Sequence, residues 1–146
     1  MTLQFGRHFL SLALALSPIF AAAQDVQSPD LILATSLAAL QKIDSSQIDT
    51  LWEDASAFVK TKVPKQEFIS GIRQSRGQYG HILKRDWAGV IRIEYPADWT
   101  DPPAGMYANA DFASRLANGQ TIFEKVSLRL EPNGWRMVGY APRDKQ

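Results

Sequence analysis

The sequence contains no cysteine, and its two histidines are His8 and His81. Without cysteine, the chain can form no disulfide. Zinc sites draw most of their ligands from cysteine and histidine, so a lone histidine in the main part of the chain is too few for a site of that type. We therefore expect a domain that folds without a disulfide, a metal or another cofactor.

The chain also lacks a surplus of charge of either sign. It has 16 Lys and Arg against 15 Asp and Glu, and Arg7 is the only charged residue among the first 23. Residues 24–146 therefore carry 15 charges of each sign. Nonspecific nucleic-acid binding and docking on anionic lipid both require a positive surface. We therefore expect neither a nucleic-acid partner nor electrostatic attachment to a membrane.

Motifs of several common enzyme classes are missing as well. The sequence has no glycine-rich phosphate loop, no nucleophile elbow and no paired-carboxylate signature of a glycosidase. These absences make an enzyme less expected but do not exclude one, because a fold can build a catalytic site from scattered residues.

What the sequence does contain begins with a segment that has the three parts of a secretory signal. Arg7 precedes the apolar run Phe9–Leu16, and a row of alanines ending at Ala23 supplies the small residues that precede a cleavage site. The apolar stretch is shorter than the roughly 20 residues of a membrane-spanning helix. We predict cleavage between Ala23 and Gln24, which removes the signal peptide (1–23). It leaves one periplasmic or secreted domain (24–146) without stable membrane insertion.

The first half of this domain has the periodicity of helices. Ser28 can cap a helix that begins at Pro29, and an apolar stripe follows at steps of three and four residues: Leu33, Leu37, Leu40 and Ile43. A capping box at Ser46 and Asp49 opens a second helix, with a buried face of Ile48, Leu51, Trp52, Ala55 and Phe58 or Val59. A third helix begins at Pro64, with Phe68, Ile69 and Ile72 inward and Arg73 and Arg76 outward.

The second half has the pattern of strands. Apolar and polar residues alternate at 91–95, and further strands are predicted at 106–116, 121–130 and 135–140. Asn118–Gly119 and Asn133–Gly134 are typical of tight hairpins, since these residue types tolerate positive φ. The predicted fold is α+β, with about three N-terminal helices packed on a four-stranded antiparallel sheet.

The most distinctive segment is the ending Gly134-Trp-Arg-Met-Val-Gly-Tyr140, which follows a strand containing Glu124. This G-W-R-x-x-G-Y ending resembles the bacterial family known as domain of unknown function 4019. Other residues agree with the resemblance: Asp44, Trp52, Gly80, Arg85, Gly105, Tyr107 and Phe112. The resemblance implies a short exported protein with a curved sheet wrapped around helices, as in a cystatin-like cone. It supplies no catalytic residues.

Glu124 is the most informative single residue, because it shares strand parity with apolar side chains. A buried carboxylate is costly unless it is paired, so Glu124 is expected to have a partner or to lie at a rim. A two-residue turn at Asn118–Gly119 would place it opposite Ala113 and diagonal to Arg115. Two interpretations stay open: an acid or ligand anchor in a pocket, or a structural ion pair with Arg115 or Arg85.

Several other side chains are candidates for function. His81 is a possible general base or a surface residue. The basic group Arg73, Arg76, Lys84 and Arg85 could receive a phosphate or carboxylate, or could be a solvated face. Trp99 lies in a proline-bounded loop and is the expected exposed aromatic. The candidate binding residues are Glu124, Arg115, Arg85, Trp99 and Tyr107.

Three functions follow from these observations. The first is a non-catalytic periplasmic binding or accessory module that holds a small ligand or an envelope protein. The second is a small cone-fold enzyme that uses Glu124 or His81 as acid or base. The third is a structural envelope protein that acts through the Trp99 loop or a strand edge. The oligomeric state is left open.

Overall fold

The computed structural model describes residues 28–145. The predicted signal peptide and the cleavage site between Ala23 and Gln24 lie outside the described residues. None of the helices within 28–145 is long and apolar enough to cross a membrane.

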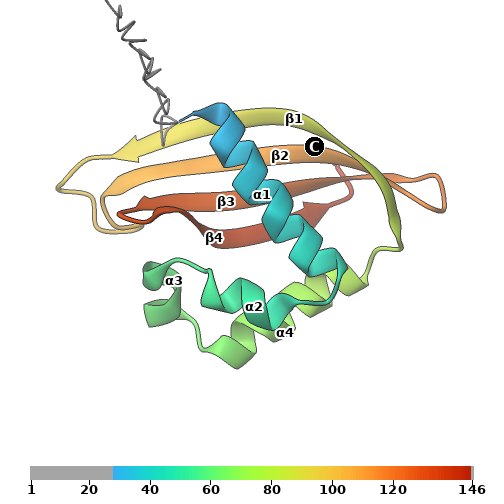
Figure 1. Ribbon diagram of the computed structural model, residues 1–146, viewed down its shortest axis with the longest axis horizontal. Coiled ribbons are helices and arrows are strands. Elements are labelled where there is room, and N and C mark those ends of the chain that lie inside the picture. Colours follow the sequence, from blue (N-terminus) through green and yellow to red (C-terminus); the bar gives the residue numbers. More distant parts are fainter. Residues whose placement is uncertain (1–27, 146) are drawn as a thin grey trace, which may run out of the picture.

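A four-stranded antiparallel sheet forms the larger part of the fold, in the order β1-β2-β3-β4 (Figure 1). The strands are β1 (Ile82–Tyr95), β2 (Gly105–Leu116), β3 (Thr121–Glu131) and β4 (Gly134–Arg143). The helices precede them: α1 (Pro29–Asp44), α2 (Ile48–Glu53), α3 (Ala57–Lys62) and α4 (Lys65–Gly77). The predicted α+β class is therefore confirmed, with four helices in place of three.

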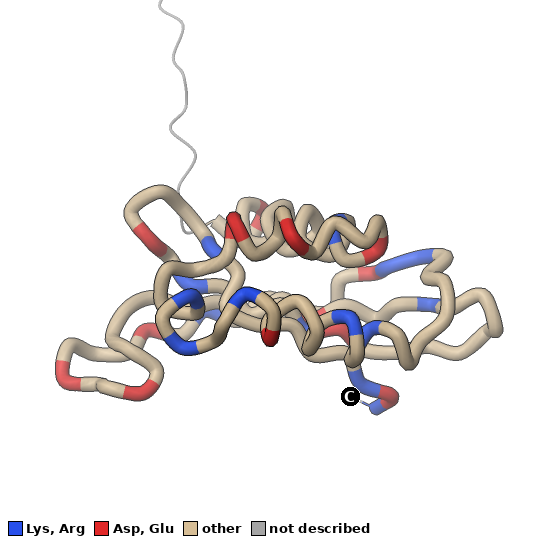
Figure 2. The backbone as a smooth tube through the Cα atoms, turned by 90° about the horizontal axis from the view of Figure 1, so that it is seen from below, with Lys and Arg blue, Asp and Glu red and all other residues tan. Residues whose placement is uncertain are grey.

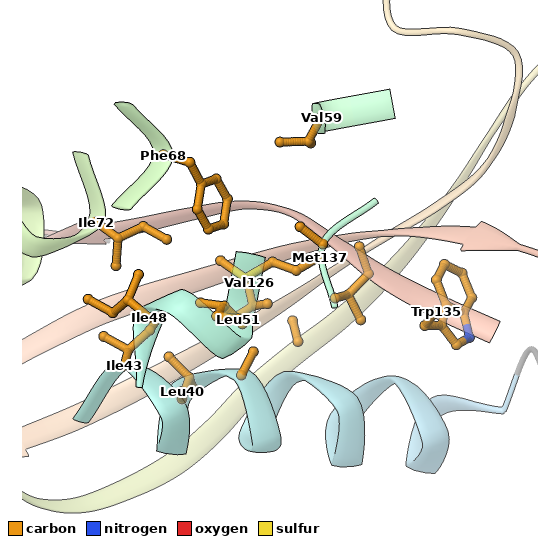
Figure 3. Close-up of a cluster of buried hydrophobic side chains, with 14 of the residues drawn as sticks. Leu40, Ile43, Ile48, Leu51, Val59, Phe68, Ile72, Val126, Trp135 and Met137 are labelled. Carbon is orange, nitrogen blue, oxygen red and sulfur yellow. The ribbon is translucent and has the colours of Figure 1, made fainter. Parts of the chain in front are cut away.

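The helices do not share one position relative to the sheet. Helix α1 crosses one face, whereas α2, α3 and α4 lie beside β4, the last strand (Figures 1 and 2). The hydrophobic core fills the space between α1, the shorter helices and the covered face of the sheet (Figure 3). The sheet supplies Ala108, Ala110, Phe112, Val126 and Leu128 to this core.

Helix α1 begins as predicted but buries a different stripe. Ser28 caps it, because its hydroxyl accepts a hydrogen bond from the Leu31 amide at 3.2 Å. Its buried residues are Ile32, Ser36, Ala39, Leu40 and Ile43. The prediction for Leu37 was wrong, since this side chain is 46% exposed. Ser36 takes the buried position because its hydroxyl donates to the Ile32 carbonyl at 2.8 Å, which satisfies its polarity inside the core.

The second predicted helix is broken in two between Asp54 and Ser56. Ala55 forms a parallel bridge with Met137 on β4, and the Ser56 amide donates to the Met137 carbonyl at 2.9 Å. Glu131, at the end of β3, then accepts hydrogen bonds from the Ser56 hydroxyl at 2.5 Å and the Ala57 amide at 3.0 Å. The chain therefore leaves helical geometry to pair with β4 and restarts as α3.

The hairpin between β2 and β3 is one residue longer than predicted. The Leu116 amide donates to the Gln120 carbonyl at 2.8 Å, and Gly119 has a φ of +87°. This three-residue loop pairs Glu124 with Phe112 rather than with Ala113. Arg115 consequently lies exposed on the face opposite to Glu124, and the predicted contact between them is absent.

The edge strand β1 carries an unusual amount of exposed apolar surface. Within the described chain β1 pairs with β2 alone. Leu83, Trp87 and Ile91 along β1 are all exposed. Because an unpaired edge with apolar side chains is a template for pairing with another chain, the hypothesis of protein–protein contact applies most directly to this edge.

Candidate functional site

Glu124 is completely buried, with 0% of its surface exposed, yet both carboxylate oxygens are occupied by donors. Arg85 donates from Nε to Oε2 at 2.6 Å and from Nη2 to Oε1 at 3.2 Å. The Tyr140 hydroxyl donates to Oε1 at 2.7 Å, and the Ser114 hydroxyl donates to Oε2. A carboxylate that only accepts hydrogen bonds fits this arrangement of four donors.

The register of the sheet brings these four residues together. Glu124 lies on β3, and Ser114 lies two pairs along on the neighbouring β2, on the same face. Arg85 on β1 is paired directly with Ser114, and Tyr140 on β4 is paired with Val126, two residues from Glu124. All four therefore point to the covered face. Of the two partners expected for Glu124, the structure shows Arg85.

Arg85 also contacts the helices. Its Nη1 lies 2.5 Å from Asp44 Oδ2, and its Nη2 donates to Oδ1 at 3.0 Å. Asp44 ends α1 and is also 3.4 Å from Arg76 Nη2 on α4. Arg76 Nη1 in turn donates to the carbonyls of Tyr79 and Gly80, each at 3.1 Å. We call Glu124, Arg85, Asp44, Arg76, Ser114 and Tyr140 the buried network; it reaches solvent at Asp44, whose side chain is 32% exposed.

The network is electrically balanced, with two carboxylates and two guanidinium groups. Burial alone would lower the pKa of Arg85, but hydrogen bonds and charge interactions with Asp44 and Glu124 outweigh it and raise the pKa. Burial raises the pKa of the Tyr140 hydroxyl, and the charge of Glu124 and the hydrogen bond to it raise it further. Arg85 therefore stays charged and Tyr140 stays a neutral donor.

The basic residues singled out in the sequence all meet acidic residues of the chain itself. Arg76 was predicted to point outward, but only 15% of its side chain is exposed, because it reaches Asp44. Arg73 lies 3.6 Å from Asp49, and Lys84 lies 2.8 Å from Asp86. Arg76 and Arg85 therefore share Asp44, whereas Arg73 and Lys84 form separate ion pairs.

His81 does not join the network. The residue is exposed, and its carbonyl accepts a hydrogen bond from the Ala117 amide at 2.8 Å. No cavity described below has His81 in its lining. Within residues 28–145 no cluster of three or more acidic, histidine or cysteine residues could hold a metal ion.

Trp99 and Tyr107 belong to an aromatic cluster at one end of β1 and β2. Trp99 is 49% exposed, as expected, and its ring centroid lies 5.6 Å from that of Tyr95. Tyr95 meets Tyr107 edge-on at 5.3 Å, and Arg129 lies 5.7 Å from the Tyr107 ring centre. Tyr107 lies on the face of the sheet opposite to Ala108, so this cluster is separate from the buried network.

An apolar groove lies between α3, α4 and β4. Its volume is about 410 Å³. Its lining is Phe58, Val59, Lys62, Val63, Glu67, Phe68, Gly71, Ile72, Val138, Gly139 and Tyr140. Tyr140 belongs to both features, because its side chain reaches the groove and its hydroxyl donates to Glu124. The sequence pattern predicts Phe58 and Phe68 on helices, but it does not indicate that a groove opens between them.

Helices on one face and one edge of an antiparallel four-stranded sheet, with a balanced buried network, define a small α+β domain. The family described as a protein of unknown function (DUF4019) matches residues 35–140. The chain belongs to this family, as the G-W-R-x-x-G-Y ending indicated, and the matched range contains the whole buried network. No curated protein and no solved structure matches the chain.

Proposed function

We propose that the protein is an exported binding module whose domain is a cystatin-like cone, and that the groove between α3, α4 and β4 holds its ligand. The observation that supports this most is the groove itself. Its volume of about 410 Å³ is within the range of about 300–1,000 Å³ that is usual for small-molecule sites. The lining is mainly aliphatic and aromatic, so the ligand would be an apolar compound.

The state of Glu124 favours binding over acid–base catalysis. A general acid or base must come within hydrogen-bond reach of the proton it transfers. Glu124 is fully buried, and donors from Arg85, Ser114 and Tyr140 occupy both of its oxygens. The network therefore supports the wall of the groove through Tyr140 and offers no open carboxylate to a substrate.

The groove can be blocked without disturbing the core, because of Gly71. This glycine lines the groove, and a Cβ built on it meets nothing within 4 Å. Gly71→Leu should fill the groove, while Gly71→Ala should leave room and is the matched control. Titration with the neutral fluorophore N-phenyl-1-naphthylamine should show binding to wild type and Gly71→Ala, and at least about tenfold weaker binding to Gly71→Leu. Equal binding to all three proteins, or none to wild type, would reject the groove as the site.

Export is tested by the N-terminus of the mature protein. Expressed with its leader in a bacterial host, the protein should appear in the periplasm or medium with Gln24 as its first residue, as read by intact mass. Ala23→Leu should block cleavage, because the position before the cut must be small, whereas Ala22→Leu should be tolerated. A full-length chain that stays in the cytoplasm would contradict the proposal.

A further inference from the structure

A second cavity lies between α1, α2 and β4, nearer the start of the same strand. Its volume is about 190 Å³. Four buried side chains form its apolar surface: Ala39, Leu51, Trp135 and Met137. Figure 3 shows Trp135 and Met137 on the side of β4 that faces α1. The cavity is partly open to solvent and is distinct from the groove, which is lined by Val138, Gly139 and Tyr140 of β4.

Charged groups of unequal number line the cavity. Lys42 forms an ion pair with Asp54, and Arg136 Nη1 lies 3.9 Å from the other oxygen of Asp54. Arg136 Nε also donates to Asn133 at 3.3 Å. One carboxylate therefore serves two cations, which leaves a surplus positive charge at an otherwise apolar cavity.

Lys42 and Arg136 also have more N–H donors than their contacts with Asp54 and Asn133 use. Lys has three N–H groups and Arg has five. Asp54 accepts one hydrogen bond from Lys42 and only a long contact from Arg136. Just over a quarter of each cationic side chain is exposed, at 28% for Lys42 and 28% for Arg136, so both can reach an incoming anion.

We propose that this cavity binds a small organic carboxylate. The apolar body of the ligand would lie against Trp135, Leu51 and Met137, and its carboxylate would take the donors left by Lys42 and Arg136. The volume suits a single ring or a short branched chain. This site goes beyond the proposed function, because it uses different residues and a charged ligand.

The test uses benzoate and its neutral isostere benzamide, with the Trp135 indole N–H followed by NMR. Trp135→Phe assigns this signal among the four tryptophans of the chain. Benzoate should shift the signal and bind about tenfold or more tightly than benzamide, because hydrogen bonds to charged groups contribute more than neutral ones. Equal affinities, or no shift up to the solubility limit of benzoate, would overturn the proposal.

Variants test the charge argument in opposite directions. Arg136→Met should weaken benzoate binding about tenfold. Asp54→Asn should strengthen it, because the competing carboxylate is gone.

Ala38→Leu, in the lining, should block binding, and Ala34→Leu, one turn earlier and outside the lining, is its control. Weaker binding by Asp54→Asn would overturn the assignment. Since Gly71→Leu should leave benzoate binding intact, failure of the groove and failure of this cavity give different results.

Discussion

Glu124→Leu should lower the free energy of unfolding by about 3–5 kcal/mol, because Arg85 loses its fully buried partner and keeps only the partly exposed Asp44. The charge left behind is Arg85, of which only 13% of the side chain is exposed. Ser114 and Tyr140 would also lose their acceptor. Urea unfolding followed by circular dichroism measures the change.

A double-mutant cycle separates the pair from the rest of the network. Arg85→Met combined with Glu124→Leu should be less destabilised than the sum of the two single variants, because no lone buried charge remains. Lys65→Met is the control, since the Lys65–Glu53 pair is exposed and should contribute little. If Glu124→Leu lowered the free energy of unfolding no more than Lys65→Met does, Arg85 and Tyr140 would have to be hydrated when Glu124 is absent.

Leu40→Ala should cost about 2–5 kcal/mol, because it creates a cavity in the core. Leu40 is 0% exposed and lies between α1 and the sheet. Leu37→Ala, one turn earlier on the same helix, should change the free energy of unfolding by no more than about 0.5 kcal/mol, since Leu37 is a surface residue. Leucine and alanine have similar helix propensities, so the two substitutions differ mainly in burial.

Thermal and urea unfolding of both variants provide the comparison. The spacing of leucines predicts that Leu37 and Leu40 share one buried stripe, whereas the structure buries Ser36 and Leu40. Equal decreases in the free energy of unfolding for Leu37→Ala and Leu40→Ala would mean that both leucines are buried, as their spacing predicts, and would contradict the structure.

The buried network shows how much of the candidate site the local sequence pattern can predict. Strand alternation places Glu124 on an apolar face and requires a partner for it, and Arg85 is one of the two arginines that the sequence offers. The choice between Arg85 and Arg115 depends on register, and one extra loop residue before Gly119 changes it. Asp44 joins from α1, far along the chain, and no periodicity links it to β3.

The groove and the smaller cavity could not be predicted from the local sequence pattern. The residues from Ser46 to Val59 have the amphipathic spacing of one helix, yet Ser56 pairs with Met137 on β4 and divides it. Such a long-range hydrogen bond leaves no trace in local periodicity. The smaller cavity is lined by α2 and the groove by α3, so neither could be predicted before the two helices were placed against β4.

Helix α3, which forms one wall of the groove, has only six residues. Isolated helices shorter than about 12–15 residues are marginal in water, so α3 depends on its tertiary contacts. Its first free amide, on Ala57, is held by Glu131 at the end of β3. The wall is therefore complete only after the sheet has formed, and an unfolded or partly folded chain has no groove. Any occupant of the groove selects the fully folded chain, and its binding free energy adds to the free energy of unfolding.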